Sequence, residues 1–160
     1  MPNKSTASTL TLPSDREIEM SRLFNAPRAL VWAAYTDPRH VANWWGTGNP
    51  ETTIIDEMDV RPGGRWRWLV RKDGAEYGFR GEYVEVVPPE KLVYTFDFEP
   101  PSAPMTYTLT FHELDGKTRL TACTRFASKE ARDGTLGYGM VAGANMAWDM
   151  LEALLATLQA

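Results

Sequence analysis

"TYTLTFHELDGKTRLTACTRF", residues 106–126, alternates apolar and polar side chains on both sides of a tight turn. Tyr107, Leu109 and Phe111 face one way and the intervening threonines the other, because successive side chains of a strand point to opposite faces. The Asp-Gly pair at 115–116 is favoured in two-residue hairpin turns. This stretch therefore predicts an antiparallel hairpin with one apolar and one solvated face.

The same two-residue period recurs along most of the chain. A first strand is predicted at 16–24, and a six-stranded meander follows later in the sequence. Turns rich in glycine, proline and aspartate separate the strands of the meander, which are predicted at 52–60, 65–70, 77–87, 91–98, 105–114 and 118–126. Consecutive strands joined by such short turns form antiparallel sheets.

Two short helices are predicted between the first strand and the meander, at 25–36 and 37–46. Asp37 suits an N-cap, Pro38 suits the first helical position, and Gly46 suits a left-handed helix end. Together the two segments form a helical elbow.

The last stretch of the chain, 137–160, is predicted to be one long amphipathic helix. Its apolar residues step by three and four, at Val141, Ala144, Trp148, Leu151, Leu155 and Leu158. We expect an α+β fold in which this helix lies across the apolar face of a curved sheet, because no other surface is wide enough to bury it.

Composition limits the function classes. The chain has 160 residues, which suits one domain over 15–160 behind a flexible polar leader at 1–14. A net charge of −4 argues against nucleic-acid or anionic-membrane partners, and no apolar run is long enough to span a membrane. The leader lacks the apolar region of a signal peptide, and the single Cys123 suits a reducing compartment. We therefore expect a cytoplasmic protein.

The residues that usually carry metal or nucleophilic chemistry are few. His40 and His112 have no partner at metal-ligand spacing, so we expect no metal site and no cofactor. Cys123 is predicted on the outer face of its strand without a neighbouring base to activate it. The Gly-Gly pair at 63–64 lacks the lysine and hydroxyl residues of a phosphate-binding loop and is interpreted as a turn.

Polar side chains supply the candidates for chemistry in a cavity, although no catalytic residue is assigned. Glu82 and Asp97 lie on neighbouring predicted strands, and general acid–base catalysis would need one of them buried with a raised pKa. Solvated pairing on the outer face is the alternative. Asn145 and Glu152 flank the apolar stripe of the last helix, where they could contact a ligand or lie at the solvent boundary.

The aromatic residues allow two interpretations. They could fill the space between helix and sheet, since each buries a large area. The small Ala144 and Ala147 on the helix, and Gly78 and Gly81 in a strand, instead leave room opposite large rings and favour a ligand cavity. The predicted cavity residues are Trp32, Trp44, Trp45, Trp66, Trp68, Phe96, Tyr107, Leu109, Phe111, Ala144, Trp148 and Leu151.

The adjacent Trp44 and Trp45 cannot both occupy the middle of one helical stripe, because neighbouring residues point about 100° apart. The preferred hypothesis is that Trp45 packs inward as an anchor while Trp44 lies at the cavity mouth, and the reverse assignment is kept open.

The order of these elements resembles the helix-grip fold of the START-like, or SRPBCC, superfamily, which includes the birch-pollen-allergen group. Within it the chain is similar to the bacterial relatives of the activator of the ninety-kilodalton heat-shock protein ATPase. The resemblance spans roughly residues 16–158 and rests on six motifs in order: "FNAPRALVWAAYTDP", "WWG", "RPGGRWRW", "GEYVEVVPPEKLVYTF", "TYTLTFHELDGKTRLTACTRF" and "AWDMLEALL". It implies a sheet wrapped around the long helix with a hydrophobic cavity between them.

The leading functional hypothesis is the binding of a hydrophobic small molecule in that cavity. One alternative is a cyclase- or hydrolase-like enzyme that uses the same cavity. A second alternative, from family resemblance alone, is an accessory protein with a chaperone partner. Met146 and Met150 on the back of the last helix could belong to a protein-binding patch or a homodimer interface.

Overall fold

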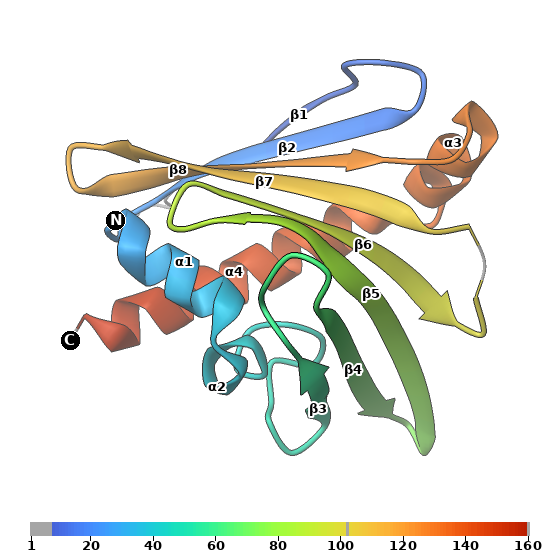
Figure 1. Cartoon of the computed structure of the whole chain (residues 1–160), viewed down its shortest axis with the longest axis horizontal. Helices are drawn as coiled ribbons and strands as arrows, with labels where there is room; N and C mark the ends of the chain where they lie inside the picture. Colours follow the sequence, from blue (N-terminus) through green and yellow to red (C-terminus); the bar gives the residue numbers. More distant parts are fainter. Residues whose placement is uncertain (1–7, 102, 160) are drawn as a thin grey trace.

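The computed structural model describes residues 8–101 and 103–159, and eight antiparallel strands within these ranges form one curved sheet (Figure 1). Their order is β1-β2-β8-β7-β6-β5-β4-β3, as expected when a meander pairs its last strand with the first long one. The strands are β1 (Thr9–Thr11), β2 (Glu17–Phe24), β3 (Thr53–Met58), β4 (Arg65–Lys72), β5 (Ala75–Val87), β6 (Lys91–Glu99), β7 (Met105–Leu114) and β8 (Lys117–Arg125).

Strands β7 and β8 form the hairpin that was predicted at residues 106–126. Leu109 pairs with Ala122 and Phe111 with Leu120, so the apolar residues share one face. The turn residues Asp115 and Gly116 both have positive φ angles, of 51° and 80°, as the favoured two-residue hairpin turn requires.

Irregularities in β3 and β5 bend the other side of the sheet. The register shifts between Ile55 and Glu57 in β3 and between Tyr83 and Glu85 in β5. Such bulges increase local twist and bend a strand. The bends fit the curvature with which the sheet wraps around the long helix.

Within the described ranges four helices accompany the sheet: α1 (Arg28–Thr36), α2 (Pro38–Val41), α3 (Lys129–Gly137) and α4 (Met140–Leu158). Helix α4 runs along the concave side of the sheet, and α1 lies beside it (Figure 1). The prediction of an α+β helix-grip fold is therefore confirmed. No helix among the described residues is long and apolar enough to cross a membrane.

The helix boundaries differ from the prediction in two places. Helix α2 ends at Val41, and turns continue to Gly46, whose φ of 67° is left-handed as predicted. The predicted helix at 137–160 begins only at Met140, because Gly139 has a φ of 82°. Helix α3 was not predicted, although its N-cap Ser128 accepts a hydrogen bond from the Ala131 N–H.

The predicted leader is partly ordered. Residues 1–7 lie outside the described residues, but Thr9–Thr11 form β1 and pair with β2 from Ser21 to Glu19. This short strand covers the edge of β2, whose backbone groups would otherwise lack partners. The Arg22 Nε also donates a hydrogen bond to Ser8 Oγ.

A buried arginine fixes α4 to the sheet. Arg22 on β2 is only 3% exposed, and its guanidinium lies 2.9 Å from the Asp149 carboxylate and 3.2 Å from that of Glu152. It also donates to the Asn145 side chain at 3.2 Å. Trp148, which directly precedes Asp149 on α4, meets the Phe24 ring edge-on with the ring centroids 5.7 Å apart. These contacts hold the side of α4 that faces β2.

Candidate ligand cavity

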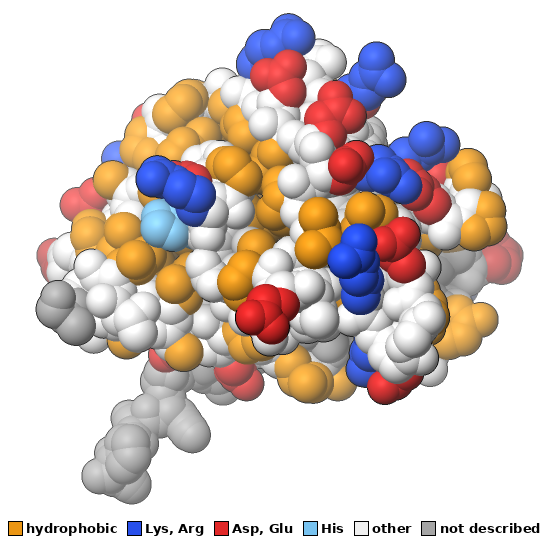
Figure 2. Space-filling model, turned by 90° about the horizontal axis from the view of Figure 1, so that it is seen from below, with side chains coloured by type: hydrophobic (Ala, Val, Ile, Leu, Met, Phe, Trp, Pro, Cys, Tyr) orange, Lys and Arg blue, Asp and Glu red, His pale blue; other side chains and the backbone are white. Residues whose placement is uncertain are grey.

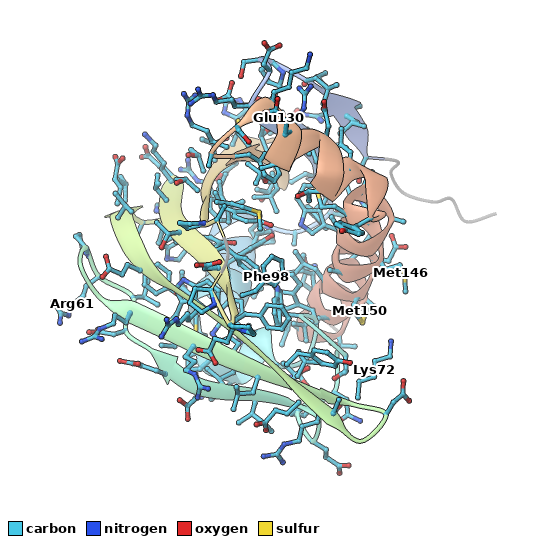
Figure 3. The ribbon with its side chains drawn as sticks, turned by 90° about the vertical axis from the view of Figure 1, so that its right-hand side faces the viewer. Arg61, Lys72, Phe98, Glu130, Met146 and Met150 are labelled. Atoms are coloured by element: carbon cyan, nitrogen blue, oxygen red, sulfur yellow. The ribbon has the colours of Figure 1, made fainter. Side chains whose placement is uncertain are left out.

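A cavity of about 900 Å³ lies between the concave face of the sheet and α4. Its walls come from β2, β4, β6, β7 and β8, from the segment after α2, and from α1, α3 and α4. Figure 3 shows Phe98 on the sheet side of this opening, with Met146 and Met150 on α4 across from it. The volume is within the range of small-molecule binding sites in proteins.

The wall of the cavity is apolar and uncharged. Aromatic rings from the sheet and the elbow meet small residues on the helices, where Gly134 and Gly143 lie beside Ala144 and Ala147. Among the described residues that line the cavity, none is an Asp, Glu, Lys, Arg or His. The polar atoms are therefore the hydroxyl and indole groups of neutral side chains.

Three of these polar groups are the phenols of buried or half-buried tyrosines. The Tyr35 hydroxyl, on α1, accepts a hydrogen bond from the Trp148 Nε1–H at 3.0 Å. Tyr94 and Tyr107, on β6 and β7, stack with their rings 5.3 Å apart. Burial raises the pKa of Tyr107 to about 12, and a hydrogen bond to Thr124 opposes that rise. Burial also raises the pKa of Tyr35 and of Tyr94, so all three phenols are neutral at physiological pH.

The two adjacent tryptophans have different surroundings, and the preferred assignment is reversed. Trp44 is only 3% exposed; its Nε1 donates to the Ala34 carbonyl at 2.9 Å and its ring packs 4.8 Å from that of Tyr35. Trp45 is half-buried and meets the Trp68 ring edge-on at 4.8 Å. Both line the cavity, but Trp44 is the anchor because its indole hydrogen bond to Ala34 ties α1 to the turns that follow α2.

Most of the predicted cavity residues line the cavity. The structure brings together Trp44, Trp45, Trp68, Phe96, Tyr107, Leu109, Ala144 and Trp148. The remaining four, Trp32, Trp66, Phe111 and Leu151, pack among other side chains instead.

These four were misplaced for identifiable reasons. Trp32 and Phe111 stack against each other at 5.2 Å between α1 and β7. Trp66 shares a strand face with Trp68, but its Nε1 donates to the Thr95 carbonyl and its ring is covered by neighbouring rings. Leu151 lies two turns further along α4 than Ala144, where the helix is packed against the core.

The four predicted polar contacts do not line the cavity. Asp97 alternates with the lining residues Phe96 and Phe98 and so points to the opposite face of β6. Glu82 is exposed and pairs in register with Arg65 on β4. Asn145 and Glu152 contact Arg22 instead, because the buried guanidinium needs hydrogen-bond acceptors.

Several lining residues were missed by the sequence analysis. Tyr35 lies in the predicted helix at 25–36 and Tyr94 in the predicted strand at 91–98, but neither was predicted to line the cavity. The apolar stripe of α1 and the alternation along β6 were the signals that could have placed these two rings on the sheet–helix interface. Gly134 and Thr135 belong to α3, which was itself missed.

Exposed apolar side chains surround the cavity mouth, which we define by Phe98, Tyr138 and Met146. All three line the cavity, and they are 41%, 91% and 65% exposed, respectively. On the face shown in Figure 2, acidic and basic side chains are interspersed, and hydrophobic side chains reach the surface between them. Because Phe98, Tyr138 and Met146 are uncharged, the mouth offers apolar contact to a ligand.

The histidines and the cysteine lie outside the cavity. His112 is exposed and His40 is half-buried. Burial first, and then the nearby Glu17 carboxylate, raise the pKa of Cys123 to about 11, so the thiol is protonated at physiological pH. Within residues 8–101 and 103–159, no group of three His, Cys, Asp or Glu side chains is arranged to hold a metal ion.

Comparison with known proteins identifies the family. The family described as "Activator of Hsp90 ATPase homolog 1-like protein" matches residues 25–156. The crystal structure of protein Ms6760 from Mycobacterium smegmatis is 30% identical, with a TM-score of 0.83 over 96% of this chain and 99% of that chain.

Two further solved structures share the fold. A Rhodobacter sphaeroides protein is 23% identical, with a TM-score of 0.85 over 94% of this chain and 99% of that chain. An Arthrobacter aurescens protein is 22% identical, with a TM-score of 0.83 over 93% and 91%. No curated protein matches the chain. The predicted resemblance is confirmed, and the chain belongs to the START-like family of Activator of Hsp90 ATPase homolog 1-like proteins.

Proposed function

We propose that the protein binds a hydrophobic small molecule in the cavity between the sheet and α4. The observation that carries this proposal is an uncharged apolar cavity of about 900 Å³ that opens to solvent between Phe98 and Met146. The fold family to which the chain belongs commonly binds hydrophobic ligands, which supports the proposal.

The energetics favour an apolar guest. Water inside such a cavity finds few hydrogen-bond partners, since a buried water usually makes about three. A guest that removes apolar wall and ligand surface from water gains roughly 25 cal/mol per Å². The aromatic rings of Trp45, Trp68 and Phe96 give the guest flat surfaces to pack against.

The enzymatic alternative lacks support from the side chains that would carry it. Glu82, Asp97, Asn145 and Glu152 all lie away from the cavity wall. The family name suggests chaperone ATPase stimulation, which requires a protein-binding surface rather than a deep cavity.

Native mass spectrometry of freshly purified protein should detect a retained small molecule. A second test is titration with the neutral dye N-phenyl-1-naphthylamine. Ala144→Phe places a ring in the cavity and should weaken dye binding roughly tenfold or more. Ala142→Phe adds the same ring to an exposed position of α4 outside the wall and should leave dye binding unchanged. Equal affinity in both variants would contradict binding in this cavity.

The two tryptophans allow an independent test. Trp45→Ala should mainly weaken dye binding and have the smaller effect on the melting temperature of the two variants, because Trp45 is a half-buried wall residue. Trp44→Ala should mainly lower the melting temperature, because it removes a buried ring and its hydrogen bond to Ala34. Identical changes in both readouts would rule out the division of roles.

A further inference from the structure

The Tyr35 hydroxyl is a hydrogen-bond donor without a protein acceptor in the cavity wall. Its oxygen accepts the proton of Trp148 Nε1 at 3.0 Å. Trp148 is its only hydrogen-bond partner among residues 8–101 and 103–159, so the phenol's own proton remains to be donated. Both residues line the cavity and both are buried. Since a buried donor gains from an acceptor, this arrangement favours a ligand that brings one.

The bond from Trp148 makes Tyr35 the strongest candidate among the three phenols. A hydroxyl that accepts a hydrogen bond becomes more polarised and donates more strongly, because bonds in a chain reinforce each other. Tyr107 already interacts with the Thr124 side chain. Tyr94 contacts the rings of Tyr83 and Tyr107 and receives no hydrogen bond from a described residue that would polarise it in this way.

Among the described residues, the cavity wall offers no positive charge to a ligand. The two buried arginines lie outside the wall and are already paired. The Arg22 guanidinium is bound by side chains of α4, and that of Arg132 by Asp133 and the Ser14 carbonyl. A carboxylate would therefore lose its hydration without gaining a counter-ion. That loss is large for an ion and modest for a carbonyl group.

We propose that the cavity selects uncharged apolar molecules that carry a hydrogen-bond-accepting carbonyl, such as a ketone or ester, and that Tyr35 donates to this acceptor. This inference rests on the proposed function and names its ligand class. It makes Tyr35 a specificity-determining residue and excludes the corresponding carboxylates from the cavity.

Three bicyclic probes of similar size test the proposal by equilibrium dialysis at pH 7.5: methyl 2-naphthoate, 2-naphthoate and 2-ethylnaphthalene. The ester should bind roughly 100-fold more tightly than the carboxylate. This comparison uses the unmodified protein and does not depend on any variant. A carboxylate affinity within threefold of that of the ester would overturn the proposal.

Tyr35→Phe tests the donor itself. It should weaken binding of the ester by roughly tenfold and leave binding of 2-ethylnaphthalene unchanged, because the hydrocarbon has no acceptor. Tyr83→Phe is the matched control, since Tyr83 is buried but lies outside the cavity wall, and it should change neither affinity. Equal weakening of ester and hydrocarbon in Tyr35→Phe would show that the ring only shapes the cavity and would overturn the role of its hydroxyl.

The neutral dye separates failure of this inference from failure of the proposed function. If N-phenyl-1-naphthylamine binds in the cavity and the ester does not bind better than the carboxylate, the ligand class is wrong and the cavity function stands. If neither the dye nor any of the three probes binds, the proposed function is wrong, and the inference is overturned with it.

Discussion

The C-terminal half of α4, from Leu151 to Leu158, turns a packed apolar face to the core, whereas the N-terminal half, from Met140 to Met150, borders the cavity. In the C-terminal half, Leu151 and Leu155 are completely or almost completely buried. In the N-terminal half, Ala144 and Ala147 line the cavity. Both halves belong to one helix and face the same sheet.

The difference lies in side-chain size rather than in helical periodicity. Apolar residues continue at steps of three and four through both halves, and in the C-terminal half Leu151 and Leu155 fill the space against the core. In the N-terminal half, the small Gly143, Ala144 and Ala147 leave open volume between the helix and the sheet. An amphipathic stripe therefore predicts which face of a helix is turned inward, and the volumes of its residues decide whether a core or a cavity results.

The largest expected effect concerns the packed half. Leu151→Ala should lower the free energy of unfolding by about 3 kcal/mol, because it leaves a void in a close-packed region. Ala147→Leu adds side-chain volume beside open space and should change it by less than about 1 kcal/mol. Urea denaturation of both variants measures the contrast. Similar losses of unfolding free energy in the two variants would mean that the N-terminal half is also closely packed.

Removal of the arginine that holds α4 should have the next largest effect. Arg22→Ala should lower the free energy of unfolding by about 2 kcal/mol, because Glu152 and Asn145 lose a buried partner. The control is Arg67→Ala, which removes a solvent-facing pair with Glu99 and should cost much less. The same denaturation experiment ranks the two, and the reverse ranking would show that α4 is held by apolar packing alone.

Two glycine substitutions should have small effects of opposite sign. Gly143→Ala should stabilise the protein by about 0.5–1 kcal/mol, because Gly143 is inside α4 and an added Cβ meets no other atom within 4 Å. Gly48→Ala should destabilise it, because Gly48 has a φ of 71° and its new Cβ would clash with the Met150 sulfur. Thermal melts measure the sign of the stability change in each variant. A destabilising Gly143→Ala would indicate that the first half of α4 needs its flexibility.

The smallest expected effect is a pH dependence at the elbow on the other side of the cavity. The Arg39 side chain, through its hydrogen bond with Asp37, lowers the pKa of that carboxyl to about 2. Because the folded-state pKa lies below the ordinary value of 3.8, this contribution to stability is present at neutral pH and is lost as the pH falls from about 4 to about 2. Asp37→Asn should lower the melting temperature at pH 6 and have a much smaller effect at pH 2, where about half of the Asp37 carboxyls are already protonated. An equal loss at both pH values would assign the effect to the neutral cap alone.

The sequence predicted the sheet and the long helix because their signals are repeated many times. Every strand from 16–24 onward was identified through alternation and turn residues. The missed elements, β1 and α3, are short and carry few apolar residues, so their periodicity is weak. Pairing with the β2 edge forms β1, and such tertiary contacts leave no local pattern.

The composition of the cavity wall was harder to predict than the fold. Alternation placed Trp66 and Trp68 on the same face, but rings from the distant strand β6 cover Trp66, whereas Trp68 reaches the cavity. The hydrogen bond between Trp148 and Tyr35 joins residues 113 positions apart, so no local spacing could have indicated it.

The distribution of tryptophans gives the protein an internal optical reporter. The indoles of Trp44, Trp45, Trp68 and Trp148 border the space where a guest would sit, whereas those of Trp32 and Trp66 are set back from it. Trp45, Trp68 and Trp66 stand ring to ring, close enough to share excitation energy. Occupancy should therefore be readable from the intrinsic emission of the unlabelled chain.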